Sequence, residues 1–189
     1  MEAAVLNKSR ALEDAAQSVK ISQSPISVLV SALALAVAGN DKKAEDLANN
    51  LAQKRPYDTF VQFIGSPAVH AQVDLNHNNP AKAIDLLDNA MVYARANTTL
   101  LYFRGNAYLK AGRGGDAVQA FQRMLEVKGY AGIDPLMPLA NLGLARAYAL
   151  AGDKARSRVA YQDFLGLWKD ADADLPLLRE AKAEYAKVQ

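Results

Sequence analysis

The two histidines of the chain are the residues with the clearest potential for metal or acid–base chemistry. His70 and His77 bracket Asp74 in the pattern H-x-x-x-D-x-x-H. On a helix, residues four and seven positions apart share one face, so three ligands to a metal ion are geometrically possible. The alternative is structural: His70 hydrogen-bonds to a buried Asp74, and His77 lies in solvent at the end of the helix.

Other catalytic chemistry has little support in the sequence. The chain has no cysteine, which excludes thiolate metal sites, iron–sulfur clusters, disulfides and a cysteine nucleophile. The Gly-Arg-Gly-Gly run at 112–115 follows a helical pattern and is not followed by Lys-Ser/Thr, so we interpret it as a turn rather than a phosphate-binding loop. No Ser–His–Asp order or pair of carboxylates stands out. We predict a protein that is not an enzyme, with no catalytic residue, no metal and no cofactor.

The charge balance gives no sign of a nucleic-acid binder. The 189 residues carry 22 Lys+Arg and 20 Asp+Glu, a formal net charge of +2. A nucleic-acid patch shows a larger excess with interleaved aromatic residues. Lys154, Arg156 and Arg158 are close together, and we interpret them as a solvated helix face, with a contact to an acidic partner as the alternative.

No segment resembles a signal peptide or a membrane span. The first fifteen residues mix acids and bases and lack a continuous apolar core. The most apolar stretch, residues 26–39, has 14 residues, whereas a bilayer span needs about 20. We interpret the stretch as a buried helix, and we predict a cytoplasmic protein without membrane contact.

Apolar residues recur at helical spacing along most of the chain, and strand signals are scarce. Short breaks at 39–41, 78–80, 112–115 and 152–153 separate the helices, which predicts a series of antiparallel helix pairs. The breaks repeat: Ala83 lies 34 residues before Ala117, and Tyr108 lies 40 before Tyr148. Small residues Gly105 and Ala145 are expected to face Ala117 and Ser157, with large rings between successive pairs: Tyr108, Phe121, Tyr148 and Tyr161.

These spacings resemble the tetratricopeptide repeat, a 34-residue helix–turn–helix signature matched best by Leu101, Gly105, Tyr108, Ala117 and Phe121. The resemblance implies one all-α domain over residues 1–189, a right-handed superhelix of about four helix pairs with a flanking helix at each end. It also places His70 and Asp74 toward the interior of the stack, which favours their structural role. The expected segments are an N-terminal cap (1–22), four repeats (24–56, 58–97, 98–131 and 138–171) and a C-terminal cap (174–189).

The resemblance implies that the first helix of each repeat lines a concave groove that binds a peptide or a partner domain. Carried over by position, the groove residues are Gln72, Asn76, Tyr102, Asn106, Lys110, Leu142 and Arg146. The Lys/Asn/Arg clamp with which some members hold a C-terminal carboxylate is absent apart from an amide, because its places hold Ala68, Gln72, Phe103, Leu139 and Gly143. In the C-terminal cap, Leu175, Leu178, Ala181 and Tyr185 form one apolar stripe, and the charged residues lie on other faces: Arg179, Glu180, Lys182 and Glu184.

The run from Leu142 to Val188, and above all residues 166–172, resembles the C-terminal repeat region of bacterial Ser/Thr kinases and winged-helix transcriptional regulators. The chain has no kinase motifs, so kinase activity would belong to a domain outside it. The implied function is a protein–protein interaction module, the regulatory or scaffold part of a larger signalling protein. The alternative is self-association as a homodimer, through apolar surface near Tyr130–Met137 or the end helices.

Overall fold

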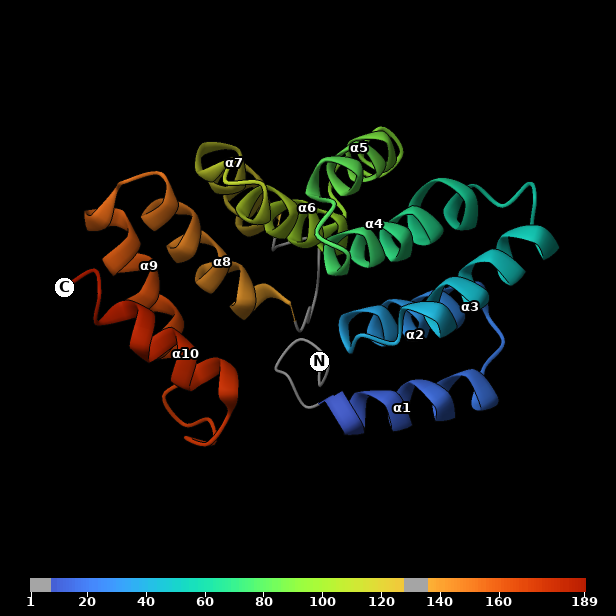
Figure 1. Cartoon of the computed structure of the whole chain (residues 1–189), viewed down its shortest axis with the longest axis horizontal. Coiled ribbons are helices and arrows are strands. Elements are labelled where there is room, and N and C mark those ends of the chain that lie inside the picture. Colours follow the sequence, from blue (N-terminus) through green and yellow to red (C-terminus); the bar gives the residue numbers. More distant parts are fainter. Residues whose placement is uncertain (1–7, 128–135) are drawn as a thin grey trace. The chain divides into compact units, whose positions relative to one another are not determined.

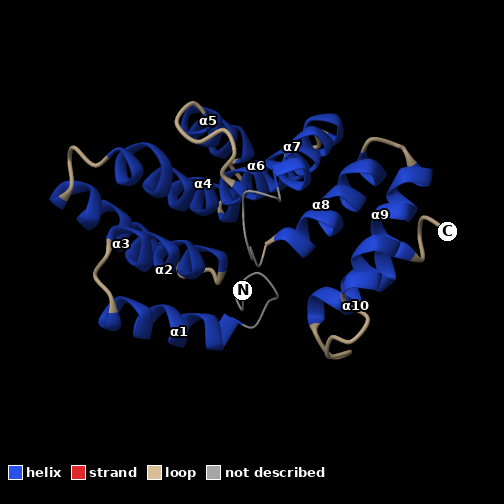
Figure 2. Ribbon diagram, turned by 180° about the vertical axis from the view of Figure 1, so that it is seen from behind, coloured by secondary structure: helices blue, strands red, loops and turns tan. Residues whose placement is uncertain are grey.

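The regular structure of the chain is helical wherever the computed structural model describes it, which is over residues 8–127 and 136–189 (Figure 2). No helix in these two ranges is both long enough and apolar enough to pass through a lipid bilayer. The all-α prediction is confirmed. The elements are α1 (Lys8–Ile21), α2 (Pro25–Val37), α3 (Asp41–Lys54), the π-helical turn η1 (Val61–Gly65), α4 (Ser66–Asn76), α5 (Pro80–Met91), α6 (Thr98–Lys110), α7 (Gly114–Glu126), α8 (Met137–Leu150), α9 (Lys154–Leu167) and α10 (Pro176–Tyr185).

The chain divides into two compact units, one ending at Arg95 and the other beginning at Ala96. In the first unit, α2 pairs with α3 and α4 pairs with α5, and α1 packs on α2 (Figure 1). In the second unit, α6 pairs with α7 and α8 pairs with α9, and α10 packs on α9 (Figure 1). That all of these helices belong to one domain stays a prediction.

The four helix pairs turn in the same way. Each turn contains a residue with positive φ: Gly39 (86°), Asn78 (61°), Gly112 (73°) and Gly152 (83°). The amide of the next residue donates to a carbonyl five residues back, as in the bond from Asp153 N to Tyr148 O at 2.9 Å. This hydrogen bond and the left-handed residue are typical of a helix end that reverses direction. The turns predicted from the sequence are therefore confirmed.

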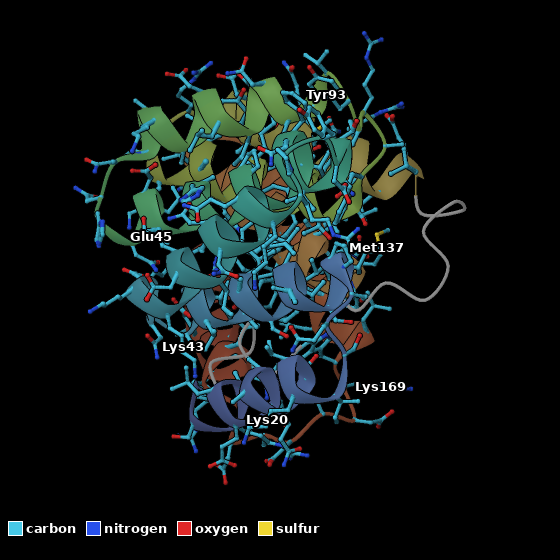
Figure 3. The ribbon with its side chains drawn as sticks, turned by 90° about the vertical axis from the view of Figure 1, so that its right-hand side faces the viewer. Lys20, Lys43, Glu45, Tyr93, Met137 and Lys169 are labelled. Atoms are coloured by element: carbon cyan, nitrogen blue, oxygen red, sulfur yellow. The ribbon has the colours of Figure 1, made fainter. Side chains whose placement is uncertain are left out.

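In the first unit, small side chains allow the helices to approach one another closely. Ala32, Ala44 and Ala48 are completely buried where α2 meets α3. Leu12 and Ala15 of α1 pack against the same core, so α1 covers part of α2 that would otherwise be exposed. The charged side chains of Lys20 on α1 and Lys43 on α3 lie at the surface (Figure 3).

A π-helical turn, Val61–Gly65, leads into α4. The Asp58 carboxylate accepts a hydrogen bond from Val61 N at 3.1 Å, and the Gln62 amide donates to Ala52 O at 2.8 Å. A Cβ on Gly65 would come within 2.4 Å of Leu29 Cδ1. The turn therefore brings the backbone of this segment directly against α2.

In the second unit, the aromatic ring of Phe121 is the centre of the core. Its side chain is completely buried, between Gly105 of α6 and Gly143 of α8. A Cβ on either glycine would lie within 2.5 Å of the ring. Between α8 and α9, the buried Ser157 hydroxyl donates to Ala145 O at 2.9 Å. The predicted crossing of Ala145 and Ser157 and the Phe121 ring between successive pairs are confirmed, whereas the facing of Gly105 and Ala117 stays a prediction.

Candidate functional site

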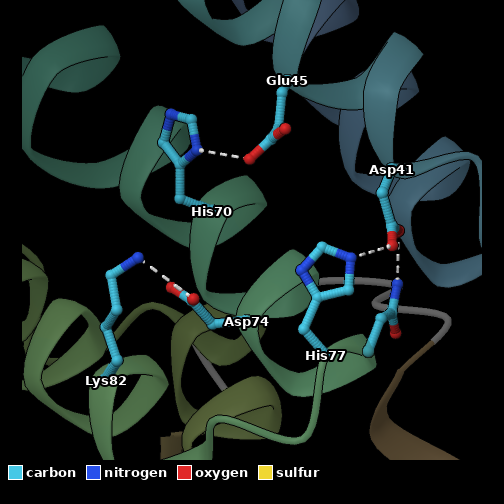
Figure 4. Close-up of polar contacts among 7 residues, drawn as sticks. Asp41, Glu45, His70, Asp74, His77 and Lys82 are labelled. Atoms are coloured by element: carbon cyan, nitrogen blue, oxygen red, sulfur yellow. Dashed lines mark hydrogen bonds and ion pairs between the residues drawn. The ribbon is translucent and has the colours of Figure 1, made fainter.

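The His70–Asp74 pair does not form the hydrogen bond that we expected. Asp74 is buried, but its Oδ1 accepts from Lys82 Nζ of α5 at 3.1 Å (Figure 4). The His70 Nδ1 lies 3.8 Å from Glu45 Oε1 of α3 (Figure 4). The expectation was wrong because α4 packs between two helices, and each of the two side chains finds its partner on a different one.

His77 lies at the exposed end of α4, as expected, and its Nε2 lies 3.2 Å from Asp41 Oδ2 (Figure 4). His70, Asp74 and His77 thus face three separate partners rather than one point. Over residues 8–127 and 136–189, no three His, Asp or Glu side chains converge as metal ligands.

Asn76 links the two helix pairs of the first unit. Its amide nitrogen donates to Ala36 O at 2.7 Å and to Asp41 Oδ1 at 2.6 Å, and its Oδ1 accepts from Gln72 Nε2 at 2.8 Å. Of the predicted groove residues, Gln72 and Asn76 are therefore adjacent in the structure. The Asn76 amide holds α4 against α2 and the start of α3, and the Gln72 amide hydrogen-bonds to Asn76 within α4.

We expect Asn76→Ala to lower the free energy of unfolding of the first unit by about 1–2 kcal/mol, because two hydrogen bonds between helix pairs are lost. Urea unfolding followed by circular dichroism measures this change. The matched control is Asn50→Ala, since Asn50 is exposed on α3. Equal stabilities of the two variants would contradict the linking role of Asn76.

In the second unit, Tyr102, Asn106 and Lys110 follow one another at four-residue intervals along one face of α6. The Tyr102 ring packs edge-on against Phe103 and Phe121, at centroid distances of 5.5 and 6.2 Å. Burial raises the pKa of Tyr102, although a hydrogen bond with the Asn106 side chain and the charge of Arg146 act in the opposite direction. Tyr102, Asn106 and Arg146 are therefore close to one another; that they line a binding groove stays a prediction.

Arg146 is the charged centre of this surface, and its partners lie on α10. The guanidinium Nε donates to Glu184 Oε2 at 2.9 Å, and Nη2 lies 3.3 Å from Glu180 Oε2. The Tyr161 hydroxyl of α9 donates to Glu184 Oε2 at 3.0 Å. Burial lowers the pKa of Arg146, but the hydrogen bond to Glu184 and the charges of both glutamates outweigh it, so the net shift is upward. Burial and the Glu184 carboxylate likewise raise the pKa of Tyr161.

This site differs in two ways from the groove that the tetratricopeptide resemblance implied. Leu142 is only 2% exposed and belongs to the core, so it offers no open apolar contact. Glu180 and Glu184 complete the site, yet the sequence indicated only that they lie off the apolar stripe of their helix. Their four-residue spacing was the available signal, because it places both carboxylates on one face.

The basic residues at the start of α9 are mostly engaged within the chain. The Arg156 guanidinium lies 4.7 Å from the centroid of the Tyr148 ring, and its Nε donates to Asp153 Oδ2 at 2.5 Å. The backbone and side-chain hydrogen bonds from Arg156 hold the pKa of Asp153 below its ordinary value. Arg158 Nε donates to Val188 O at 3.2 Å, whereas Lys154 is exposed. Two of the three cations therefore stabilise the local fold.

Comparison with known proteins agrees with this architecture. A family model described as "Tetratricopeptide repeat" matches residues 69–135 and 104–176, which together make up more than half of the chain. The chain belongs to the tetratricopeptide repeat family. The crystal structure of a thermophilic TPR protein from Thermus thermophilus superposes with a TM-score of 0.67 and 18% identity, over 96% of this chain and 90% of that one. No curated protein matches the sequence.

Tetratricopeptide repeats are protein-interaction and scaffolding modules, and their fold is typically non-catalytic. Apart from the Gln72 amide, which donates to Asn76, the clamp for a C-terminal carboxylate has no counterpart among the described side chains at its expected places. Ala68, Phe103 and Leu139 are buried in the core, and Gly143 is packed against Phe121. In this TPR chain, Asn106 of α6 and Arg146 of α8 are partly exposed polar residues on adjacent helices.

Proposed function

We propose that the chain is a non-catalytic module that binds a peptide or a partner domain on the surface formed by α6 and α8. The observation that carries this proposal is the grouping of Tyr102, Asn106 and Arg146 on two adjacent helices, each side chain partly exposed. An amide and a guanidinium provide directional hydrogen bonds to a polypeptide, and a tyrosine adds a large rigid contact area. Lys110 continues the same face of α6 at its exposed end.

The biological setting that we propose is the regulatory or scaffold part of a larger bacterial signalling protein. The support is the resemblance of residues 142–188 to the repeat regions of such proteins. In this setting, the repeats contribute the binding of a partner, and a separate domain contributes the output.

Site-specific cross-linking in the source cells tests the binding surface. A photoreactive residue replaces Lys110 on α6 and, as the matched control, Gln119 on α7, since both side chains are exposed. We expect a cross-linked partner from position 110 and none from position 119. Equal cross-linking from the two positions contradicts the placement of the surface on α6.

The purified partner then allows a quantitative test. We expect the double variant Asn106→Ala/Arg146→Ala to raise the Kd of that complex about tenfold or more, because two polar contacts are removed. Gln119→Ala should leave the Kd unchanged. An unaltered affinity of the double variant, with circular dichroism showing a folded protein, excludes these residues from the interface.

A further inference from the structure

The last helix, α10, occupies one side of the proposed binding surface. Its Glu184 accepts hydrogen bonds from Arg146 Nε at 2.9 Å and from the Tyr161 hydroxyl at 3.0 Å. Glu180, one turn earlier, lies on the same face and pairs with Arg146 Nη2 at 3.3 Å. An amphipathic helix with two glutamates four residues apart is therefore a ligand that this surface already holds.

α10 does not satisfy Arg146 fully. The Nη2 atom is buried and makes no hydrogen bond, because the 3.3 Å approach of Glu180 is an ion pair without hydrogen-bond alignment. Arginine and a carboxylate bind best through two parallel hydrogen bonds. A helix from another protein that presents its carboxylates in this geometry would gain one charge-assisted hydrogen bond that α10 does not make.

The attachment of α10 also allows it to be displaced. Its apolar contact comes from three buried residues, Leu177, Leu178 and Ala181, with Val188 just beyond its end. The Tyr185 ring adds a contact to the Tyr161 ring at a centroid distance of 6.1 Å, and its hydroxyl accepts from Gln162 Nε2 at 2.9 Å. Eight residues, 168–175, connect α9 to α10, and fully extended they span about 26 Å. The helix can therefore leave the surface while α8 and α9 keep their own pairing.

We propose that the surface around Arg146 and Tyr161 binds an amphipathic helix of a partner protein that carries two glutamates one turn apart, and that this helix displaces α10. This inference rests on the proposed function and specifies its partner. In the unbound protein, α10 holds the surface closed and keeps the Arg146 charge paired. A partner helix competes with α10, so the apparent affinity depends on the fraction of chains in which α10 is undocked.

A peptide with the sequence of residues 172–189, labelled with a fluorophore, serves as the probe for such a helix. The peptide is titrated by fluorescence anisotropy onto the full chain, either wild type or the double variant Glu180→Gln/Glu184→Gln. The variant loosens its own α10 and leaves Arg146 and Tyr161 intact. The matched control is Asp163→Asn/Asp170→Asn, which removes two exposed acids elsewhere in the second unit.

We expect the peptide to bind the double variant at least about tenfold more tightly than the wild type or the control, because the competing helix is weakened. A peptide with glutamine in place of both glutamates should bind at least about tenfold more weakly, because it lacks the charges that pair with Arg146. Adding Arg146→Gln to the variant should abolish binding. Circular dichroism and thermal melting of each variant serve to check that the helix pairs of the second unit remain folded.

Several results would overturn the inference. They are equal affinity for wild type and variant, binding that does not depend on the glutamates or on Arg146, and no binding to a folded variant. A mass of two chains for the variant, measured by light scattering, would also overturn it, because it assigns the surface to the α10 of a second copy. If the peptide does not bind the folded variant while the affinity of the partner complex still depends on Asn106, the proposed function stands and only the displacement of α10 is excluded.

Discussion

Replacing Phe121 by alanine should lower the free energy of unfolding of the second unit by about 3–5 kcal/mol. The ring is completely buried between two glycines, Gly105 and Gly143, which have no side chain with which to fill the space. A cavity next to two glycines collapses only if the helix backbones themselves move. The loss of stability therefore includes both the transfer free energy of the ring and the free-energy cost of the cavity that remains.

Urea unfolding followed by tryptophan fluorescence measures this change. Trp168, the single tryptophan of the chain, lies in the second unit with its ring 5.1 Å from that of Phe164. Leu150→Ala is the control in the same unit, because Leu150 is 47% exposed. Its effect should stay below about 1 kcal/mol. Equal losses for the two variants would show that Phe121 is not the centre of this core.

A second large change in the free energy of unfolding is expected from Gly143→Ala. The added Cβ would lie 2.4 Å from the Phe121 ring, and the ring is completely buried. In a helix interior, alanine is ordinarily more favourable than glycine by about 1 kcal/mol. Overpacking outweighs that gain, so we expect a net loss of about 1–3 kcal/mol in the free energy of unfolding. The same urea titration measures it.

Gly166→Ala is the matched control for this substitution. A Cβ on Gly166 of α9 would meet no atom within 4 Å, so helix propensity alone should act and stabilise the unit by about 0.5–1 kcal/mol. In a second control, Phe121→Leu should restore part of the stability that Gly143→Ala removes, because leucine leaves the space of the ring edge free. Additive losses in the double variant would contradict the steric explanation.

The sequence was sufficient to predict the helix pairs, because they depend on local signals. The positions of Gly39, Gly112 and Gly152 in the turns, and of small residues where the helices cross, are visible in a single sequence. The π-helical turn at Val61–Gly65 could not be predicted, because it depends in part on Gln62 bonding to Ala52 O, a backbone group of the preceding helix α3.

The candidate site was predicted only in part, for a similar reason. The four-residue spacing along α6 placed Tyr102, Asn106 and Lys110 on one face. The partners of charged residues were not predictable, because they come from helices distant in sequence. Glu184 is 38 residues from Arg146, and Asp74 pairs with Lys82 of α5 rather than with His70 of its own helix. The part of the predicted dimer surface at Tyr130–Pro135 lies outside the described residues.

Within each unit, every helix packs against its immediate neighbours in the sequence or against the helix one pair away. Contacts of this kind close short loops, and the entropy lost before each contact forms is small. During synthesis, the pair α2–α3 can therefore dock while the ribosome is still adding the later repeats. The growing chain buries its apolar faces one pair at a time, and its exposure to aggregation is brief.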